Sequence, residues 1–115
     1  MSTISTVAIL GAGQMGAGIA QAVALGGYSV RLYDVAAGRL PLAQGEIAAS
    51  LARQAGRGLV DRAAADAALA RIVLTGGIAE AVAGADLVIE AALEDETVKK
   101  AIYAEVVPHL RPQTL

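Results

Sequence analysis

Residues Val7 to Asp34 read VAILGAGQMGAGIAQAVALGGYSVRLYD, and this stretch joins an apolar run to a glycine cluster and then to a helical pattern. The run Val7–Leu10 has the continuous apolar character of a strand that is buried on both faces. We expect a helix from Gln14 to Leu25, ended by a Gly26-Gly27 pair of the kind that caps helix C-termini. Its larger apolar residues recur at every fourth position, namely Met15, Ile19 and Val23. Tyr28–Tyr33 predicts a second strand, which completes a strand-helix-strand unit.

Helices and short strands alternate along the rest of the chain. Ala36–Gln54 predicts a long helix with Pro41 in its first turn, where proline is tolerated, and Gly56-Arg57-Gly58 is expected to end it. Asp61 is expected to cap a shorter helix that runs to about Ala70, so that the two helices form a hairpin. The remaining expected elements are a strand at Arg71–Thr75, a short helix at Ile78–Ala83, a strand at Asp86–Ala91 and a helix from Glu96 to Val107.

The alternation of strands and helices predicts the fold class. It implies right-handed crossovers and a parallel sheet that is covered on both faces. This α/β arrangement is the doubly wound, Rossmann-type fold with the strand order 3-2-1-4, here with a helical hairpin inserted after the second strand. No linker divides residues 1–115, so we expect one domain. Its sheet is expected to be C-terminally incomplete, because that strand order normally continues.

Composition excludes several classes of function. The 115 residues carry a net charge of −2, with the arginines scattered, which argues against a nucleic-acid partner. Cysteine is absent and His109 is the single histidine, so we expect no metal site. No apolar run reaches the length of a membrane span, and the first residues do not resemble a signal peptide. We therefore expect no membrane partner and a cytoplasmic location.

The glycine cluster has the G-x-G-x-x-G spacing. In such a loop Gly11 permits a tight turn, Gly13 lets a pyrophosphate approach the backbone, and Gly16 lets the helix pack closely on the strand. The helix N-terminus offers N–H groups to the phosphates. Asp34 ends the second strand, where a carboxylate accepts the ribose hydroxyls. The combination predicts a dinucleotide site, and the alternative is a glycine turn and a surface aspartate that serve structure alone.

Asp34 also indicates which dinucleotide binds. A carboxylate at this position repels the 2′-phosphate of NADP, and Val35 and Ala36 supply no compensating cation. We therefore expect NAD. Arg39 is close enough in sequence to reach such a phosphate, but we expect it to be a solvated side chain in the first turn of a helix.

Three segments carry a resemblance to a known family, and they are GAGQMGAGIAQ at 11–21, SLARQAG at 50–56 and DLVIEAALEDETVK at 86–99. With them, nearly the whole chain resembles the N-terminal part of the NAD-dependent L-3-hydroxyacyl-CoA dehydrogenases, including the 3-hydroxybutyryl-CoA dehydrogenases. The resemblance implies an oxidoreductase that oxidises the 3-hydroxyl of a 3-hydroxyacyl-CoA to the 3-ketoacyl-CoA and passes hydride to NAD. It also implies a role in fatty acid metabolism, in β-oxidation.

The resemblance further implies which residues bind the cofactor. They are Gly11, Gly13, Gln14, Met15, Gly16, Asp34, Ala91, Glu94 and Lys99. Ala91, Glu94 and Lys99 match positions on the nicotinamide side, where Lys99 is a donor to the ribose. This placement is consistent with a site at the topological switch point of the sheet. The alternative for Glu94 and Lys99 is an acidic residue and a lysine at an exposed helix start.

For the CoA substrate, the resemblance implies a contact with the helical hairpin. Ser50 and Arg57 match the family positions that contact CoA. Arg53 and Arg57 are four residues apart and would share a helix face, which suits a pair of cations for CoA phosphates. Gly56 and Gly58 bracket Arg57, however, and a solvated basic face is an equal alternative.

The resemblance ends before the catalytic machinery. Family members continue into a segment with a histidine base and a glutamate partner, and then into a helical dimerisation domain, none of which this sequence contains. His109 matches no part of that motif, so no catalytic residue is expected and the chain alone should bind cofactor without turnover.

Two other functions stay open at this point. One is a free-standing dinucleotide-binding module, which requires the phosphate loop and Asp34 but less the residues on the nicotinamide side, Ala91, Glu94 and Lys99. The other is a different Rossmann dehydrogenase that acts on small hydroxy acids, which would not explain the presence of the SLARQAG segment in the helical hairpin. An incomplete sheet also predicts self-association through the strand Asp86–Ala91 or through the C-terminal helix, because a bare sheet edge seeks a partner.

Overall fold

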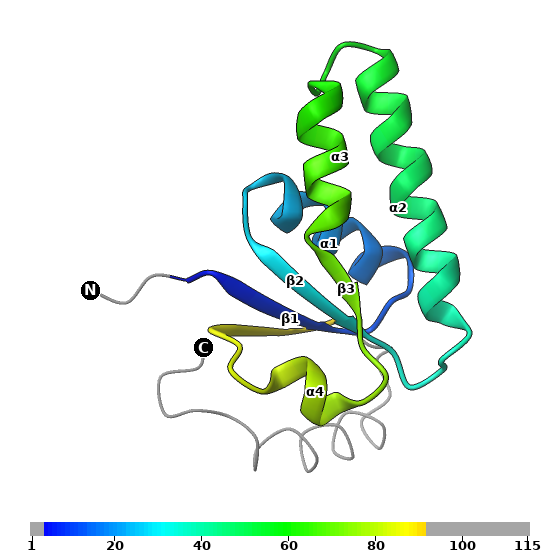
Figure 1. Cartoon of the computed structure of the whole chain (residues 1–115). Coiled ribbons are helices and arrows are strands. Elements are labelled where there is room, and N and C mark those ends of the chain that lie inside the picture. The colour runs from blue at the N-terminus through cyan, green and yellow to red at the C-terminus, as the bar shows by residue number, and fades with distance from the viewer. Residues whose placement is uncertain (1–3, 92–115) are drawn as a thin grey trace.

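The computed structural model describes residues 4–91, which form a four-stranded parallel sheet with helices packed on it (Figure 1). The strands are β1 (Thr6–Leu10), β2 (Ser29–Tyr33), β3 (Ile72–Leu74) and β4 (Leu87–Glu90). The helices are α1 (Gln14–Leu25), α2 (Arg39–Gly56), α3 (Arg62–Ala70) and α4 (Ile78–Val82). The strands lie in the order β3-β2-β1-β4, which confirms the predicted Rossmann-type order. The helix expected at Glu96–Val107 lies outside the described residues.

The sheet separates two packed layers. In Figure 1, α1, α2 and α3 lie above the sheet and α4 lies below it. The central strand β1 supplies both layers, because successive side chains point to opposite faces of a sheet. Val7 and Ile9 pack with α1, α2 and α3, whereas Ala8 and Leu10 pack with α4. The continuous apolar run that predicted a strand buried on both faces therefore has that role.

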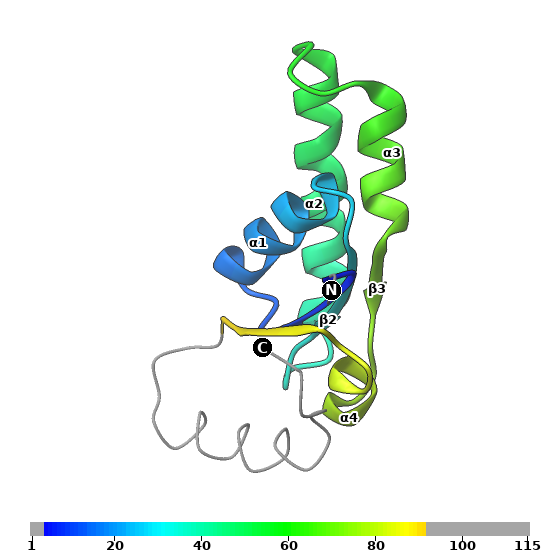
Figure 2. The ribbon, with the colours of Figure 1, turned by 90° about the vertical axis from the view of Figure 1, so that its left-hand side faces the viewer.

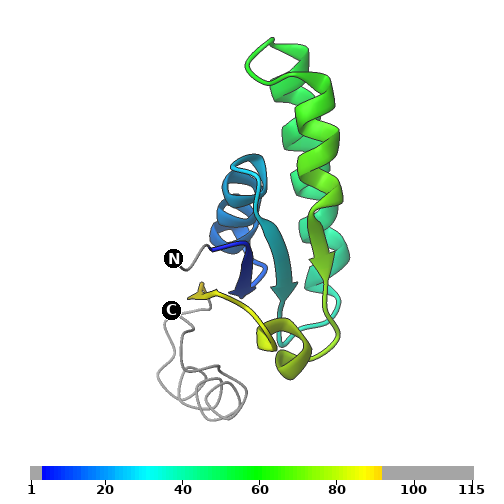
Figure 3. The same cartoon turned by 60° about the vertical axis from the view of Figure 1, so that its left-hand side comes forward.

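The hairpin of α2 and α3 extends past the sheet, as Figures 2 and 3 show. α2 begins at Arg39 rather than at the expected Ala36, because Ala36 closes a turn in which its carbonyl accepts the N–H of Arg39. α2 ends at Gly56, and Gly58, with φ of +73°, reverses the chain. Asp61 is at the N-cap position of α3, as predicted, but its side chain makes no capping hydrogen bond. Within residues 4–91, no helix is long and apolar enough to cross a membrane.

The buried face of α1 differs from the expected one. Met15 is 69% exposed, and Ile19 and Val23 are only half-buried. The face that meets the core consists of the small residues Gly16, Ala17, Ala20 and Ala24. Gly16, Ala20 and Ala24 have the same four-residue spacing as the larger residues. Small side chains are selected because α1 lies very close to the sheet.

The turn from β1 into α1 explains this closeness. Gly11 has a φ of +120°, a backbone conformation that favours glycine. A Cβ atom placed on Gly16 would lie 1.7 Å from the carbonyl oxygen of Gly11. The first and third glycines of the motif are therefore required by the fold itself.

Gly16→Ala should destabilise the protein strongly. The new methyl group meets backbone that cannot move without displacing α1, so we expect the free energy of unfolding to fall by about 3 kcal/mol. Urea denaturation followed by far-ultraviolet circular dichroism measures this change. Gly13→Ala is the matched control, because its Cβ would meet no atom of the described residues within 4 Å. Equal losses in the two variants would contradict this account of Gly16.

Candidate functional site

Three strands end together at the N-terminus of α1. Leu10, the last residue of β1, is in register with Tyr33 of β2 on one side and with Glu90 of β4 on the other. The Gly11 N–H donates to the carbonyl of Tyr33 at 2.7 Å, and the Ala91 N–H donates to the carbonyl of Leu10 at 2.8 Å. The residues that follow the three strands therefore lie side by side. This edge is the topological switch point, where open α/β sheets bind ligands.

The glycine loop presents free backbone at this edge. Gly13 is the N-cap residue of α1, no side chain caps the helix, and its first turn holds no acidic residue. The first N–H groups of a helix have no partner within the helix and attract anions. Among residues 4–91, a Cβ on Gly13 would meet no atom within 4 Å, so this part of the chain leaves open space over the loop for a phosphate. The loop fits a pyrophosphate group.

Asp34 is held beside the loop by two backbone donors. Its carboxylate accepts the N–H of Ala12 at 2.7 Å and the N–H of Ala36 at 2.8 Å. Each carboxylate oxygen has a second lone pair, which is available to a hydroxyl donor. Asp34 can therefore fix the loop and accept ribose hydroxyls at the same time.

Arg39 is not the solvated side chain that we expected. Its Nε donates to the carbonyl of Ala12 at 2.7 Å, and its Nη2 donates to both carboxylate oxygens of Glu46 at 2.9 and 3.0 Å. The side chain is only 28% exposed. Ala12 thus donates a hydrogen bond from its N–H to Asp34 and accepts one at its carbonyl from Arg39. Sequence reasoning missed Glu46, although a spacing of seven residues places it on the same helix face as Arg39.

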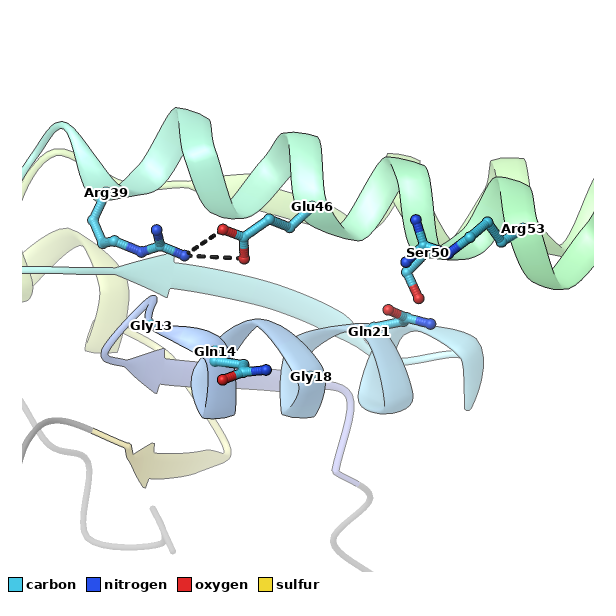
Figure 4. A pocket seen from close by; sticks show the side chains of 8 residues that line it. All are labelled: Gly13, Gln14, Gly18, Gln21, Arg39, Glu46, Ser50 and Arg53. Atoms are coloured by element: carbon cyan, nitrogen blue, oxygen red, sulfur yellow. Dashed lines mark hydrogen bonds and ion pairs between the residues drawn. The ribbon is translucent and has the colours of Figure 1, made fainter.

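An open groove of about 700 Å³ leads from the glycine loop along α1 and α2. Its lining residues are Gly13, Gln14, Gly18 and Gln21 on the side of α1 and Arg39, Glu46, Ser50 and Arg53 on α2. Figure 4 shows Gln21 and Ser50 facing one another across this groove. The groove is therefore continuous from the candidate phosphate site to the last turn of α2.

Most of the predicted site residues lie either at the glycine loop or along the groove between α1 and α2. Gln14 is exposed at the end of the groove, and Met15 is exposed in the first turn of α1. Ala91 lies next to the loop, since a Cβ on Gly16 would be 3.6 Å from the Ala91 Cβ. Glu94 and Lys99 lie outside the described residues.

The two residues expected to contact CoA are separated. Ser50 lines the groove together with Arg53, whereas Arg57 does not line it. Arg57 is exposed at the C-cap of α2, where the helix has already ended. Arg53 therefore provides a positive charge at the end of the groove that is farther from the glycine loop (Figure 4).

Comparisons with known proteins agree with this geometry. The family model of the 3-hydroxyacyl-CoA dehydrogenase NAD-binding domain matches residues 6–115. The 3-hydroxybutyryl-CoA dehydrogenase of Bradyrhizobium diazoefficiens is 42% identical over 114 residues, which are 99% of this chain and 39% of that protein. The 3-hydroxyadipyl-CoA dehydrogenase of Escherichia coli is 43% identical over 115 residues, which are 100% of this chain and 24% of that protein.

A solved structure shows the same fold. The crystal structure of 3-hydroxybutyryl-CoA dehydrogenase from Escherichia coli superposes with a TM-score of 0.93 and 41% identity, over 99% of this chain and 24% of that one. The chain thus spans between about a quarter and two-fifths of the length of these relatives. It belongs to the family of NAD-binding domains of the 3-hydroxyacyl-CoA dehydrogenases.

Proposed function

We propose that this chain is the cofactor-binding part of an oxidoreductase that oxidises the 3-hydroxyl of a 3-hydroxyacyl-CoA to a ketone. The observation that carries the proposal is the glycine loop, held beside Asp34 and open above Gly13, in a chain of this family. NAD, the cofactor of the family, accepts a hydride when it is bound. The residues of this chain bind and orient it.

The phosphates of the cofactor would be held by backbone rather than by charged side chains. The N–H groups of the first turn of α1 point outward from Gly13, and the positive end of the helix dipole faces the same space. Gln14 and Met15 flank this space with exposed side chains. The arrangement orients a pyrophosphate without a lysine or an arginine at its centre.

We propose that the nicotinamide half lies on the side of β4. Ala91 supports this proposal by its position next to Gly16, at the end of the strand that neighbours β1. Glu94 and Lys99 keep the roles that the resemblance implies for them, contact with the nicotinamide side and donation to its ribose. Asp34, on the opposite side of β1, would accept hydrogen bonds from the hydroxyls of the adenine-side ribose.

NADH binding tests the proposal directly. Titration into the chain, followed by cofactor fluorescence, should saturate, and the absence of tryptophan keeps the protein background low. Asp34→Ala should weaken NADH binding by about tenfold or more, because hydrogen bonds to a charged group are lost. Gly13→Ala should also weaken it, because the methyl group occupies the space of the phosphates. NADPH should bind more weakly than NADH.

Circular dichroism provides the control for folding in each variant. Arg62→Gln is the matched surface variant, since Arg62 pairs only with Asp66 on α3 among the interactions that the structure describes. A folded chain that binds no NADH would contradict the proposed function.

For the substrate, we propose that the CoA portion lies along the groove beside α2. The names of both curated relatives specify CoA thioesters. CoA carries phosphates, and Arg53 supplies a cation within the groove, with Ser50 as a hydrogen-bonding neighbour one turn away. Arg57 stays a predicted contact at the end of the same helix.

Arg53→Gln should weaken the binding of CoA by about three- to tenfold, because one charge-assisted hydrogen bond to a phosphate is lost. Isothermal titration calorimetry with CoA measures this effect. Arg57→Gln should have the smaller effect, since Arg57 lies outside the groove. A larger effect of Arg57→Gln than of Arg53→Gln would contradict the proposed path of CoA.

We propose that the chain alone binds its cofactor without turnover, because its single histidine, His109, matches no part of the family's catalytic motif and cysteine is absent. A role in β-oxidation is consistent with a further relative, a fatty acid oxidation complex subunit alpha of Psychrobacter cryohalolentis, which is 38% identical over 106 residues and of which the chain covers 14%. The cytoplasmic location stays a prediction.

Self-association through β4 also stays a prediction. Among the strands of residues 4–91, β4 is the last in the sheet order, and strand edges pair readily with other chains. Sedimentation velocity should show dimers that increase with protein concentration. Val73→Lys on β3, the strand at the other end of the order, should leave them unchanged. A monomer at every concentration, or dimers abolished by Val73→Lys, would contradict pairing through β4.

A further inference from the structure

Two residues that follow β2, Asp34 and Arg39, have opposite implications for the choice of cofactor. An acidic residue here binds the ribose 2′-hydroxyl of NAD, whereas a nearby arginine accommodates the 2′-phosphate of NADP. This chain has both, in Asp34 and Arg39. Both contact Ala12, one at its N–H and the other at its carbonyl. The two side chains are therefore anchored on the same loop residue, and some further feature must determine whether the guanidinium is available to a phosphate.

Glu46 is that feature. Both of its carboxylate oxygens accept hydrogen bonds from Nη2 of Arg39, at 2.9 and 3.0 Å (Figure 4). Nε of Arg39 donates to the carbonyl of Ala12. Two nitrogens of the guanidinium are thus committed to the protein. Glu46 also balances the positive charge, so that Asp34, Arg39 and Glu46 together carry one net negative charge.

We propose that Glu46 is a specificity-determining residue, which neutralises Arg39 and holds it away from the cofactor so that the chain prefers NAD to NADP. This inference rests on the proposed binding of the cofactor at the glycine loop. A 2′-phosphate that approached Asp34 would meet net negative charge, and like charges at close range strongly disfavour binding. Without Glu46, Arg39 could turn one N–H edge toward that phosphate.

The alternative is that the ion pair serves stability alone. The side chains of Arg39 and Glu46 are 28% and 50% exposed, and ion pairs at that level of exposure contribute little to stability. Loss of Glu46 should therefore leave the chain folded. A purely structural pair would also affect NADH and NADPH binding equally.

The test compares the dissociation constants of NADPH and NADH for the whole chain, both measured by cofactor fluorescence. Glu46→Gln should lower the NADPH-to-NADH ratio by about tenfold, because one like charge is removed and one cation is released. Glu46→Ala should shift the ratio in the same direction. Asp66→Asn breaks the exposed Arg62–Asp66 pair on α3 and should leave the ratio unchanged.

The role of Arg39 is tested in a double-variant cycle. In an Arg39→Gln background, Glu46→Gln should change the ratio by clearly less, because removal of the like charge remains but there is no cation to release. A ratio that stays at the wild-type value in Glu46→Gln would overturn the inference, and so would an equal shift with and without Arg39. Failure of the wild-type chain to bind NADH would contradict the proposed function together with the inference, whereas NADH binding without the shift contradicts the inference alone.

Discussion

The close approach of α1 to the end of β1 is the constraint on which the site depends. The position that a Cβ of Gly16 would take is 1.7 Å from the oxygen of Gly11 and 2.8 Å from its carbonyl carbon, which leaves no room for any side chain. This approach brings the unpaired N–H groups of the helix to the edge where β1, β2 and β4 end. It also explains why α1 meets the core with glycine and alanine. The same contact thus positions the helix dipole and limits the buried face of α1 to small residues.

A loop rich in glycine needs to be held from outside, because glycine loses more conformational freedom on folding than any other residue. The connection between β2 and α2 does this through one residue, Ala12. Asp34 binds its N–H and Arg39 binds its carbonyl. Each such bond contributes about 1 kcal/mol or somewhat more when one partner is charged. Asp34, the proposed ribose ligand, and Arg39 therefore together keep the glycine loop in one conformation.

The sequence was sufficient for the features that depend on local pattern. The order of the strands, the helical hairpin and the roles of Gly11 and Gly16 followed from apolar runs, glycine spacing and crossover rules. The buried face of α1 did not, because Met15 and its fourth-residue neighbours have the same period as Gly16, Ala20 and Ala24. Hydropathy favours the larger set, and only the distance between helix and sheet selects the smaller one.

Two further features of the site depend on partners that no local pattern specifies. Arg39 had the appearance of a solvated first-turn residue, whereas its partners are a loop carbonyl far away in sequence and a glutamate two turns along the same helix. The position of Arg57 was uncertain from the sequence because glycines flank it. Arg57 is the C-cap residue of α2, where its N–H still donates to the carbonyl of Arg53, but its side chain does not line the groove. In both cases the tertiary path of the backbone determines which cation reaches the groove.

α2 connects the two halves of the proposed site. Its core-facing residues are Leu40, Ala43, Ile47 and Leu51, and its groove-facing residues are Arg39, Glu46, Ser50 and Arg53. Because Arg39 is bonded to Ala12, the first residue of the helix has a fixed position relative to the glycine loop. Ser50 then lies about 16 Å further along the axis, at a rise of about 1.5 Å per residue. The length of one rigid helix therefore sets the separation between the cofactor phosphates and the proposed CoA contacts, and a change in the register of α2 would alter both.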